Sequence, residues 1–401
     1  TKNLLYINDA NEGGVPTFTE SAEAYGLADE GNSTQAVFFD YDMDGDMDLY
    51  VINYPIVSSR TNILEFLSYR DLAPYHRSDR LYKNEGNQKF TDVTIASGLA
   101  KYGLSLGVSV ADFNQDNWPD IYVSNDFSTP DYFLINNKDG TFTDENLNLT
   151  NHTSYFGMGL DVGDFNNDGL LDIYQVDMMP KNYRRAKENM DSMDPERFYN
   201  IVDNDMHHQY SINTLQMNLG NNPSGLPFFA DIAKFTGLSA TDWSWASLFA
   251  DFDNDGWKDV YVTNGVRRDI NNSDYFRSDE VKNFESENTL KLTLEIPSEK
   301  IDNFAFKNNG NLTFTDVSKE WGINFNGFSN GVAYADLDND GDLDLVVNNL
   351  DDKSALYENT ASDQDLNNYL RIKLKGPEGN AFGIGCKIWI EDGSEMQFQE
   401  M

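Results

Sequence analysis

Short apolar runs alternate along this chain with loops that are rich in Asp, Asn and Gly. Four of these runs begin directly after such a loop, at residues 49–52, 121–124, 260–263 and 345–348. Their β-branched and aromatic residues are typical of buried strands rather than of helices. An apolar run also enters the loops, at residues 106–110, 245–249 and 331–334. Each loop is therefore expected to join two strands.

A second phrase recurs between the loops. It consists of two short alternating segments separated by Asn- and Gly-rich residues, which predicts a β-hairpin. The pairs are residues 4–8 with 17–20, 81–84 with 89–92, 133–136 with 141–144, 215–218 with 228–231, and 305–308 with 313–316. Residues 356–359 begin a further copy without completing it. A loop with its two strands and the following hairpin make one four-stranded unit.

Four-stranded units in tandem are typical of a β-propeller, in which each blade buries its faces against its neighbours. The first loop residues are 72, 52, 87 and 85 positions apart (112 − 40, 164 − 112, 251 − 164 and 336 − 251). The extra length falls at residues 55–79, 178–212 and 265–303, always between the second and third strands of a unit. Antiparallel strands reverse direction, so the insertions are expected at the end opposite the Asp-rich loops. Residues 63–69 and 195–199 have a composition compatible with helix.

The five loops carry the candidate chemistry. Each has Asp or Asn at its first, third, fifth and ninth positions, and four of the five have Gly at the sixth. Alternate side chains of a tight loop point inward, and the seventh-position carbonyl can complete an all-oxygen shell that suits Ca²⁺. The predicted ligands are Asp40, Asp42, Asp44, Asp46 and Asp48 in loop one; Asp112, Asn114, Asp116, Trp118 and Asp120 in loop two; Asp164, Asn166, Asp168, Leu170 and Asp172 in loop three; Asp251, Asp253, Asp255, Trp257 and Asp259 in loop four; and Asp336, Asp338, Asp340, Asp342 and Asp344 in loop five.

These loops differ from EF-hands, which need a Glu at position twelve and a helix on either side. Position twelve is Val in four loops and Gln175 in the third. Only loop two lacks the glycine, and its Asn117 is a residue type that tolerates positive φ. We expect the ninth-position Asp to be a bidentate ligand. Loops two and three, with one carboxylate fewer, are expected to bind Ca²⁺ more weakly than the others.

Charge and cysteine content narrow the class of partner. The 401 residues carry a net charge of −38, which disfavours nucleic acid and anionic membranes as partners. The chain has one cysteine, Cys386, so no disulfide can form within it. No apolar run is long enough to span a bilayer, and no signal-peptide pattern follows Thr1. Weak Ca²⁺ modules make sense outside the cytosol, which predicts an extracellular or cell-surface location.

The motif Asp-Φ-Asp-Asn-Asp-Gly-x-x-Asp-Φ (Φ apolar), together with Asn-Asn-x-Gly-x-x-Phe-Thr-Asp-Val, resembles the FG-GAP/VCBS repeats of integrin α-type propellers. The resemblance covers residues 4 to 359 and implies a seven-bladed propeller, of which five metal-loop blades are visible here. Residues 17–20 would supply the fourth strand that residues 356–359 lack. Residues 368–376 and 380–388 resemble the start of an ASPIC/UnbV domain, as in proteins related to cartilage acidic protein. The predicted domains are therefore an N-terminally incomplete propeller at 1–362 and a truncated second β domain at 363–401, and features such as His207-His-Gln-Tyr resemble a bacterial, outer-membrane-exterior branch.

Known catalytic motifs are absent from the sequence: there is no nucleophile elbow, zinc motif or phosphate loop. Three of the four histidines fall in or next to an insertion or link on the side away from the loops. His207 and His208, with Arg184, Arg185 and Tyr210, would form a polar ligand site there, or would be ordinary hydrogen-bonded loop residues. Trp243 and Trp245 would stack a sugar or pack in the core.

Two functions remain. The first is a non-enzymatic, calcium-stabilised binding scaffold that meets a protein or glycan through its insertions. It is compatible with a lipid anchor upstream of this chain. The alternative is a carbohydrate-active enzyme of the polysaccharide-lyase kind, with Tyr183, Arg184 and His207 as candidate groups.

Overall fold

The structure is a computed structural model that describes residues 2–9, 14–56, 63–72, 74–127, 129–189, 195–282, 289–362, 367–393 and 395–401. The chain divides into two compact units. Unit 1 is Thr1–Leu149 with Lys373–Lys387 and Glu400–Met401, and unit 2 is Thr150–Ile372 with Ile388–Gln399. Each is described by itself.

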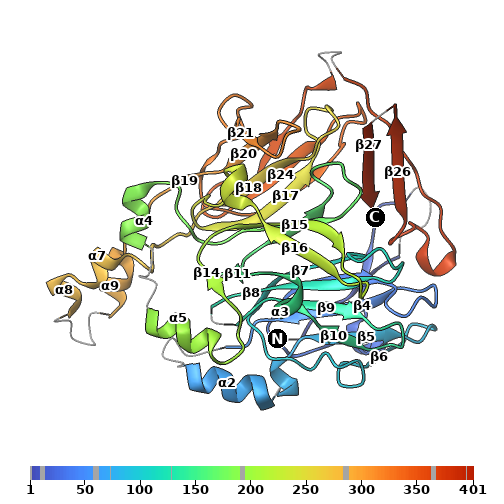
Figure 1. The fold of residues 1–401 in the computed structure, drawn as a ribbon, viewed down its shortest axis with the longest axis horizontal. Helices are drawn as coiled ribbons and strands as arrows, with labels where there is room; N and C mark the ends of the chain where they lie inside the picture. Colours follow the sequence, from blue (N-terminus) through green and yellow to red (C-terminus); the bar gives the residue numbers. More distant parts are fainter. Residues whose placement is uncertain are drawn as a thin grey trace. The chain divides into compact units, whose positions relative to one another are not determined.

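Unit 1 contains two four-stranded antiparallel sheets, blades one and two (Figure 1). Blade one is β3 (Ser33–Phe39), β4 (Asp48–Asn53), β5 (Arg80–Asn84) and β6 (Phe90–Asp92), and blade two is β7 (Ser105–Ala111), β8 (Asp120–Asn125), β9 (Tyr132–Asn136) and β10 (Phe142–Asp144). A separate hairpin, β1 (Tyr6–Asn8) and β2 (Phe18–Glu20), precedes them. The helical segments are α1 (Ala22–Tyr25), α2 (Ile63–Leu72), η1 (Tyr75–Arg77) and α3 (Asn146–Leu149).

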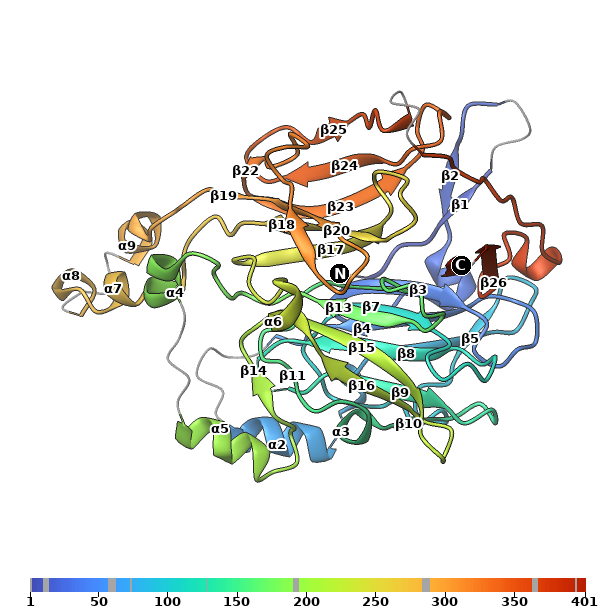
Figure 2. The same cartoon turned by 45° about the horizontal axis from the view of Figure 1, so that its top comes forward.

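Unit 2 contains blades three, four and five, whose sheets lie side by side (Figure 2). Blade three is β12 (Leu160–Gly163), β13 (Asp172–Gln175), β15 (Thr214–Asn221) and β16 (Pro227–Asp231), and blade four is β17 (Ser244–Ala250), β18 (Asp259–Asn264), β20 (Phe304–Asn308) and β21 (Phe314–Asp316). Blade five has three strands, β23 (Ser329–Ala335), β24 (Asp344–Asn349) and β25 (Ala355–Tyr357). The all-β architecture is thus five consecutive propeller blades, as the sequence predicts.

Short elements complete the chain. β11 (Thr153–Ser154) pairs with β14 (Gln209–Tyr210), β19 (Ile301–Asp302) pairs with β22 (Asn326–Gly327), and β26 (Lys387–Asp392) pairs with β27 (Glu395–Glu400) after η4 (Glu378–Asn380). The remaining helices are α4 (Tyr183–Asn189), α5 (Pro195–Val202), α6 (Ala233–Thr236), α7 (Ser273–Phe276), α8 (Asp279–Lys282) and α9 (Thr289–Glu295). Among the residues described, no helix has the length and apolarity needed to cross a membrane.

The core lies between adjacent blades, so the second strand of a blade is covered on both faces. Every residue of β4, β8 and β18 is buried, which explains their continuous apolar runs. In unit 1, Tyr50 and Ile52 of blade one belong to the same apolar cluster as Val123 and Leu134 of blade two. Burial of such side chains contributes about 1.5–3 kcal/mol each.

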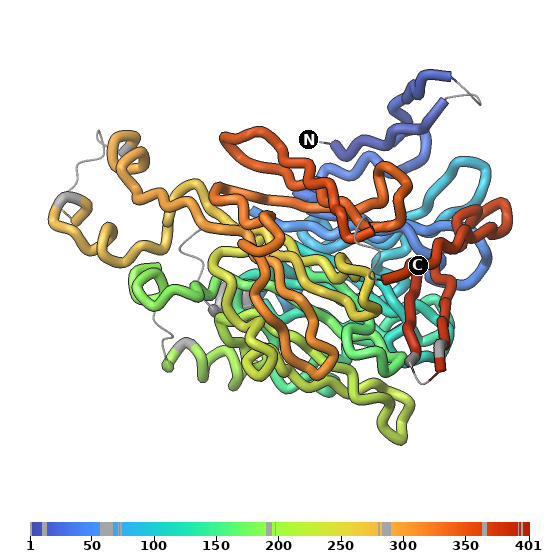
Figure 3. The backbone as a smooth tube through the Cα atoms, turned by 90° about the horizontal axis from the view of Figure 1, so that it is seen from above, coloured from blue at the N-terminus to red at the C-terminus, as the bar shows by residue number. Residues whose placement is uncertain are grey.

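The insertions leave each blade between its second and third strands. The helices expected at residues 63–69 and 195–199 are present as α2 and α5. Within unit 2, α4 packs against α7, and α7, α8 and α9 follow one another in the last insertion (Figure 3). Residues 57–62, 190–194 and 283–288 of the insertions lie outside the described part of the chain.

The hairpin expected between residues 4–8 and 17–20 is present, with β1 paired to β2 in register Tyr6 to Glu20. The sheet of β23, β24 and β25 has three strands among the described residues. That residues 17–20 supply the fourth strand of blade five stays a prediction. The expected boundary between residues 362 and 363 stays a prediction.

Candidate metal centres

The five Asp-rich loops join the first and second strands of their blades, as predicted. The backbone enters the left-handed region twice in each loop. The fourth position has φ between 56° and 69° at Met43, Gln115, Asn167, Asn254 and Asn339. The sixth position also has positive φ, and Asn117 adopts it with φ 68° where the other loops have Gly. The Gly/Asn choice at the sixth position therefore follows from backbone geometry.

The first-position carboxylate organises the turn. In loop four, Asp251 accepts the N–H groups of Asp255 at 3.0 Å and Gly256 at 2.8 Å. The same pair of bonds forms at Asp40, Asp112 and Asp164. These bonds hold the carboxylate in place and leave its remaining lone pairs free to face the middle of the loop.

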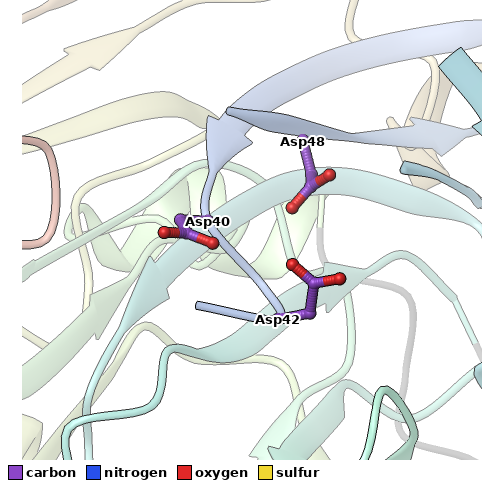
Figure 4. Close-up of side chains that lie close together, drawn as sticks. All are labelled: Asp40, Asp42 and Asp48. Carbon is purple, nitrogen blue, oxygen red and sulfur yellow. The ribbon is translucent and has the colours of Figure 1, made fainter. Parts of the chain in front are cut away.

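Three loops bring three carboxylates together, with one oxygen from each lying within 4.8 Å of the others. The groups are Asp40, Asp42 and Asp48 (Figure 4); Asp251, Asp253 and Asp255; and Asp336, Asp338 and Asp340. Loops two and three have an amide at the third position. The amide donates to the fifth-position carboxylate, from Asn114 to Asp116 at 2.8 Å and from Asn166 to Asp168 at 2.9 Å.

Unpartnered oxygens show that these groups fit a cation. One Oδ1 atom each of Asp42, Asp253 and Asp336 is buried and has no hydrogen-bond donor. A buried carboxylate oxygen without a partner costs several kcal/mol unless a donor or a metal meets it. Since the converging ligands are all oxygens, a hard cation such as Ca²⁺ or Mg²⁺ is favoured over zinc or a redox metal.

The ninth-position Asp has a structural task in every loop. Asp259 accepts the N–H of Phe252 at 3.1 Å and the N–H of Asn308 at 2.9 Å, which ties the loop to the third strand. Asp48, Asp172 and Asp344 make the same pair of bonds. Burial raises the pKa of Asp48 to about 7 and that of Asp259 to about 8. Bidentate metal binding by this residue stays a prediction, as does ligation by the seventh-position carbonyl.

Basic side chains approach the carboxylates of four loops, which sequence analysis did not anticipate. Lys83 of β5 pairs with Asp42, and Lys307 of β20 pairs with Asp253 and, at 2.6 Å, with Asp255. In loop two Lys138 lies 3.1 Å from Asp116 and Lys387 pairs with Asp112, and in loop five Arg371 pairs with Asp336. Each ammonium or guanidinium group stands where a metal cation would offset the same negative charge.

A repeated asparagine was also missed as part of the site. It lies at or near the end of the third strand of each blade and donates to the eighth-position carbonyl of its own loop: Asn84, Asn136, Asn218, Asn308 and Asn359. Three of these amides also reach the second-position carbonyl of the preceding loop, at Tyr41, Phe165 and Phe252. The sequence did contain a signal, since Asn recurs six times in the same phrase, but it gave no indication of the partners in the preceding blade.

The basic residues predicted on the insertions make two separate sets of contacts within unit 2. Arg185 is buried and binds Asp242 through two bonds of 2.7 and 2.8 Å, and it also contacts Asp269 and Glu299. His207 contacts Thr150 at 3.0 Å, and burial lowers its pKa to about 4. The described contacts therefore give these residues structural partners rather than one shared ligand site.

The remaining aromatic and histidine candidates also have partners. Tyr210 packs edge-on against His152, and His208 packs near Phe198. Trp245 donates to the Gly265 carbonyl at 2.8 Å, and both Trp243 and Trp245 are partly buried. The hydrogen bond of Trp245 and the partial burial of both tryptophans favour packing over an open sugar platform.

The fold and the repeated loops agree with comparison to known families. Residues 67–123, 112–174 and 299–347 match the FG-GAP-like repeat, so these parts of the chain are similar to that repeat.

Two curated relatives are similar to most of this chain. Cartilage acidic protein 1 of mouse (Mus musculus) and that of human (Homo sapiens) are each 24% identical to it over 301 residues, or 74% of this chain. The aligned region spans 37% and 36% of those relatives, so the chain covers little more than a third of their length. The ASPIC/UnbV-type identity of residues 363–401 and the bacterial branch stay predictions.

Solved structures resemble the chain more distantly. An Agrocybe aegerita lectin, described as recognising non-reducing terminal N-acetylglucosamine, is 14% identical with a TM-score of 0.40 and covers 89% of this chain and 75% of its own. The V. cholerae biofilm matrix protein Bap1 is 15% identical with a TM-score of 0.32, covering 79% of this chain and 34% of its own. The blade assignment rests on the strand pairing described above.

Proposed function

We propose that this chain is a non-enzymatic, calcium-stabilised binding scaffold that works outside the cell or on its surface. The observation that carries the proposal is the set of buried carboxylate oxygens without a donor at Asp42, Asp253 and Asp336. Calcium would be held by the first-, third-, fifth- and ninth-position side chains with the seventh-position carbonyl, and it would offset the charge that these loops concentrate. It would supply no reaction, only cohesion between the two strands that each loop joins.

Removal of calcium tests this role. Carboxylates at contact distance repel by roughly 1–4 kcal/mol per pair at surface-like dielectric. Saturation at a hundredfold excess over Kd stabilises the fold by about 2.7 kcal/mol per site. We expect chelation to lower the melting temperature by about 5–10 °C for each site that was filled. An unchanged melt at low ionic strength, with no heat on calcium titration, would contradict the proposal.

The insertions are the proposed contact surface for a partner. Of the aromatic residues in the insertions, Tyr75 in unit 1 and Tyr183, Tyr199 and Phe276 in unit 2 are exposed, with Tyr183 77% and Tyr199 62% accessible. Tyr54 and Tyr69 instead pack against Tyr102 and Leu104, and the side chain of Phe66 lies outside the described residues. Exposed aromatic residues on a rigid scaffold are common binding anchors.

The acidic background favours a neutral or basic protein surface as the partner. The test is crosslinking in native membranes with wild type and with a Tyr183→Ser/Tyr199→Ser variant. A matched control is Leu219→Ser, which removes an exposed apolar side chain from the β15–β16 hairpin. We expect a specific crosslinked protein to be lost only in the tyrosine variant. Binding to a glycan array by wild type, with no protein crosslink, would replace the protein partner by a glycan.

A polysaccharide-lyase activity has no specific observation in its favour. It needs Tyr183, Arg184 and His207 to converge on a substrate. Among the described contacts, Arg184 instead pairs with Glu188 and Glu299, and His207 is buried against Thr150. Turnover of an acidic polysaccharide by the purified protein would nevertheless overturn the non-enzymatic proposal.

A further inference from the structure

Two of the five blades carry, at the same position of the third strand, a lysine that reaches into their own Asp-rich loop. Strand register places it: Tyr82 pairs with Leu49 in blade one, and Phe306 pairs with Val260 in blade four. The next residues, Lys83 and Lys307, therefore occupy equivalent positions on the third strands. The other blades have Ile135, Met217 and Glu358 at this position.

Both lysines contact the third- and fifth-position carboxylates, which are proposed metal ligands. Lys83 pairs with Asp42 and lies 3.1 Å from Asp44, and Lys307 pairs with Asp253 and lies 2.6 Å from Asp255. Their side chains are about one third exposed or less. In both loops the third-position Asp uses Oδ2 for the lysine, while its Oδ1 is buried without a donor. The lysine thus offsets part of the negative charge of the loop, and it leaves one carboxylate oxygen without a hydrogen-bond donor and able to bind a metal ion.

We propose that Lys83 and Lys307 are built-in counter-ions that compete with the metal. Each fills the cation position of its loop when calcium is scarce and is displaced when calcium binds. The inference rests on the proposed calcium-binding function. Loops one and four are accordingly less dependent on calcium for folding and bind it more weakly than four carboxylates alone would. The number of carboxylates alone predicts that loops two and three bind calcium most weakly. That prediction does not take competition by the lysines into account.

Amine footprinting tests the displacement directly. The full chain is acylated with an amine reagent with and without calcium, and each lysine is quantified by mass spectrometry. Labelling of Lys83 and Lys307 should rise when calcium is added. Lys300, which pairs with Asp352 at 2.8 Å outside any loop, should not change. Calcium binding with unchanged labelling of both loop lysines would overturn the inference.

Substitution gives an independent readout. Lys307→Met should tighten the loop-four site about tenfold, because a unit charge at contact distance from the ion is removed. It should also lower the melting temperature in chelator yet raise it in calcium. A lysine with only a structural role would lower it in both conditions, as would a general folding defect, and that outcome would overturn the inference. Lys300→Met is the matched control.

The reciprocal variant guards against a misfolded Lys307→Met protein. Met217→Lys places a lysine at the same third-strand position in blade three and should weaken one site about tenfold. Unaltered affinity in both Lys307→Met and Met217→Lys would contradict the inference alone. Absence of any calcium binding in wild type would instead contradict the proposed function.

Discussion

At both ends of blade four, a side-chain oxygen accepts a backbone N–H group and so ties two strands together. The two ends nevertheless carry very different charge. At the loop end of blade four, Asp259 accepts the N–H of Asn308, and at the other end Asn303 accepts the N–H of Asn264 at 2.8 Å. The Asn303 amide also donates to Tyr261 at 3.2 Å and to Ser329 of blade five at 2.9 Å. Asn303 is uncharged and needs no counter-ion. The loop end is therefore the part of the blade whose stability depends on cations.

In blade one the two ends differ less in charge, because a carboxylate also stands at the end opposite the Asp-rich loop. Asp79 takes the place of Asn303, accepting from the N–H of Asn53 at 2.8 Å, from Tyr50 at 3.2 Å and from Ser105 of blade two at 3.1 Å. Burial raises the pKa of Asp79 to about 7, against the lowering effect of these donors and of Arg80. Asp79 of blade one therefore takes up a proton in the pH range near 7, whereas the uncharged Asn303 of blade four does not titrate.

The largest effect on stability is expected when the Asn303 hydrogen bonds, at the end of blade four opposite its Asp-rich loop, are removed. Asn303→Ala removes three hydrogen bonds and leaves the buried N–H of Asn264 and hydroxyl of Tyr261 with fewer partners. We expect a loss of about 3 kcal/mol in the free energy of unfolding, measured by urea denaturation. The loss should be equal in calcium and in chelator. A loss that depends on calcium would show that the two ends are coupled. Asn309→Ala, at an exposed hairpin position, should change stability by less than about 0.5 kcal/mol.

An intermediate effect on stability is expected when Asp79 of blade one is replaced by the uncharged Asn that blade four has at this position. Because its folded pKa is raised, Asp79 binds more protons in the folded than in the unfolded state, so its contribution to stability falls as pH rises from about 4 to about 7. Asp79→Asn should remove this fall and stabilise unit 1 by on the order of 2 kcal/mol at pH 8, with little gain at pH 4. Melts at both pH values in saturating calcium would measure it. A variant that is destabilised at pH 8 would refute the assignment.

The smallest effect is expected from lowering the charge of one loop. Asp338→Asn gives loop five the third-position amide that loops two and three already have, while its Oδ1 can still accept the N–H of Asp340. In chelator the melting temperature should rise by about 1–2 °C because repulsion is reduced. In calcium it should fall, because one coordinating charge is lost. The same sign in both conditions would mean that loop five holds no cation.

Sequence reasoning was most successful where the determinants are local. The spacing of Asp residues, the positive φ of Asn117 and the hairpin pairs depend on a few neighbouring residues, and the structure confirms the hairpins, the insertion positions and the loop backbone. Contacts fixed by packing could not be predicted. Lys83 meets Asp42 only because of strand register, and Asn136 meets the Tyr41 carbonyl, 95 positions away, only because two blades pack together.

The asparagine that links adjacent loops has a consequence for how such chains can grow. Asn308 donates to the Phe165 carbonyl of the blade before it, and Phe252 of its own blade offers the equivalent carbonyl to Asn359 of the blade after it. Blade four thus carries both halves of the link. A duplicated or deleted blade would therefore leave each junction with a donor and an acceptor. Tandem duplication of the gene segment for one blade can therefore change the number of blades while the hydrogen bond at each blade junction is kept without further mutation.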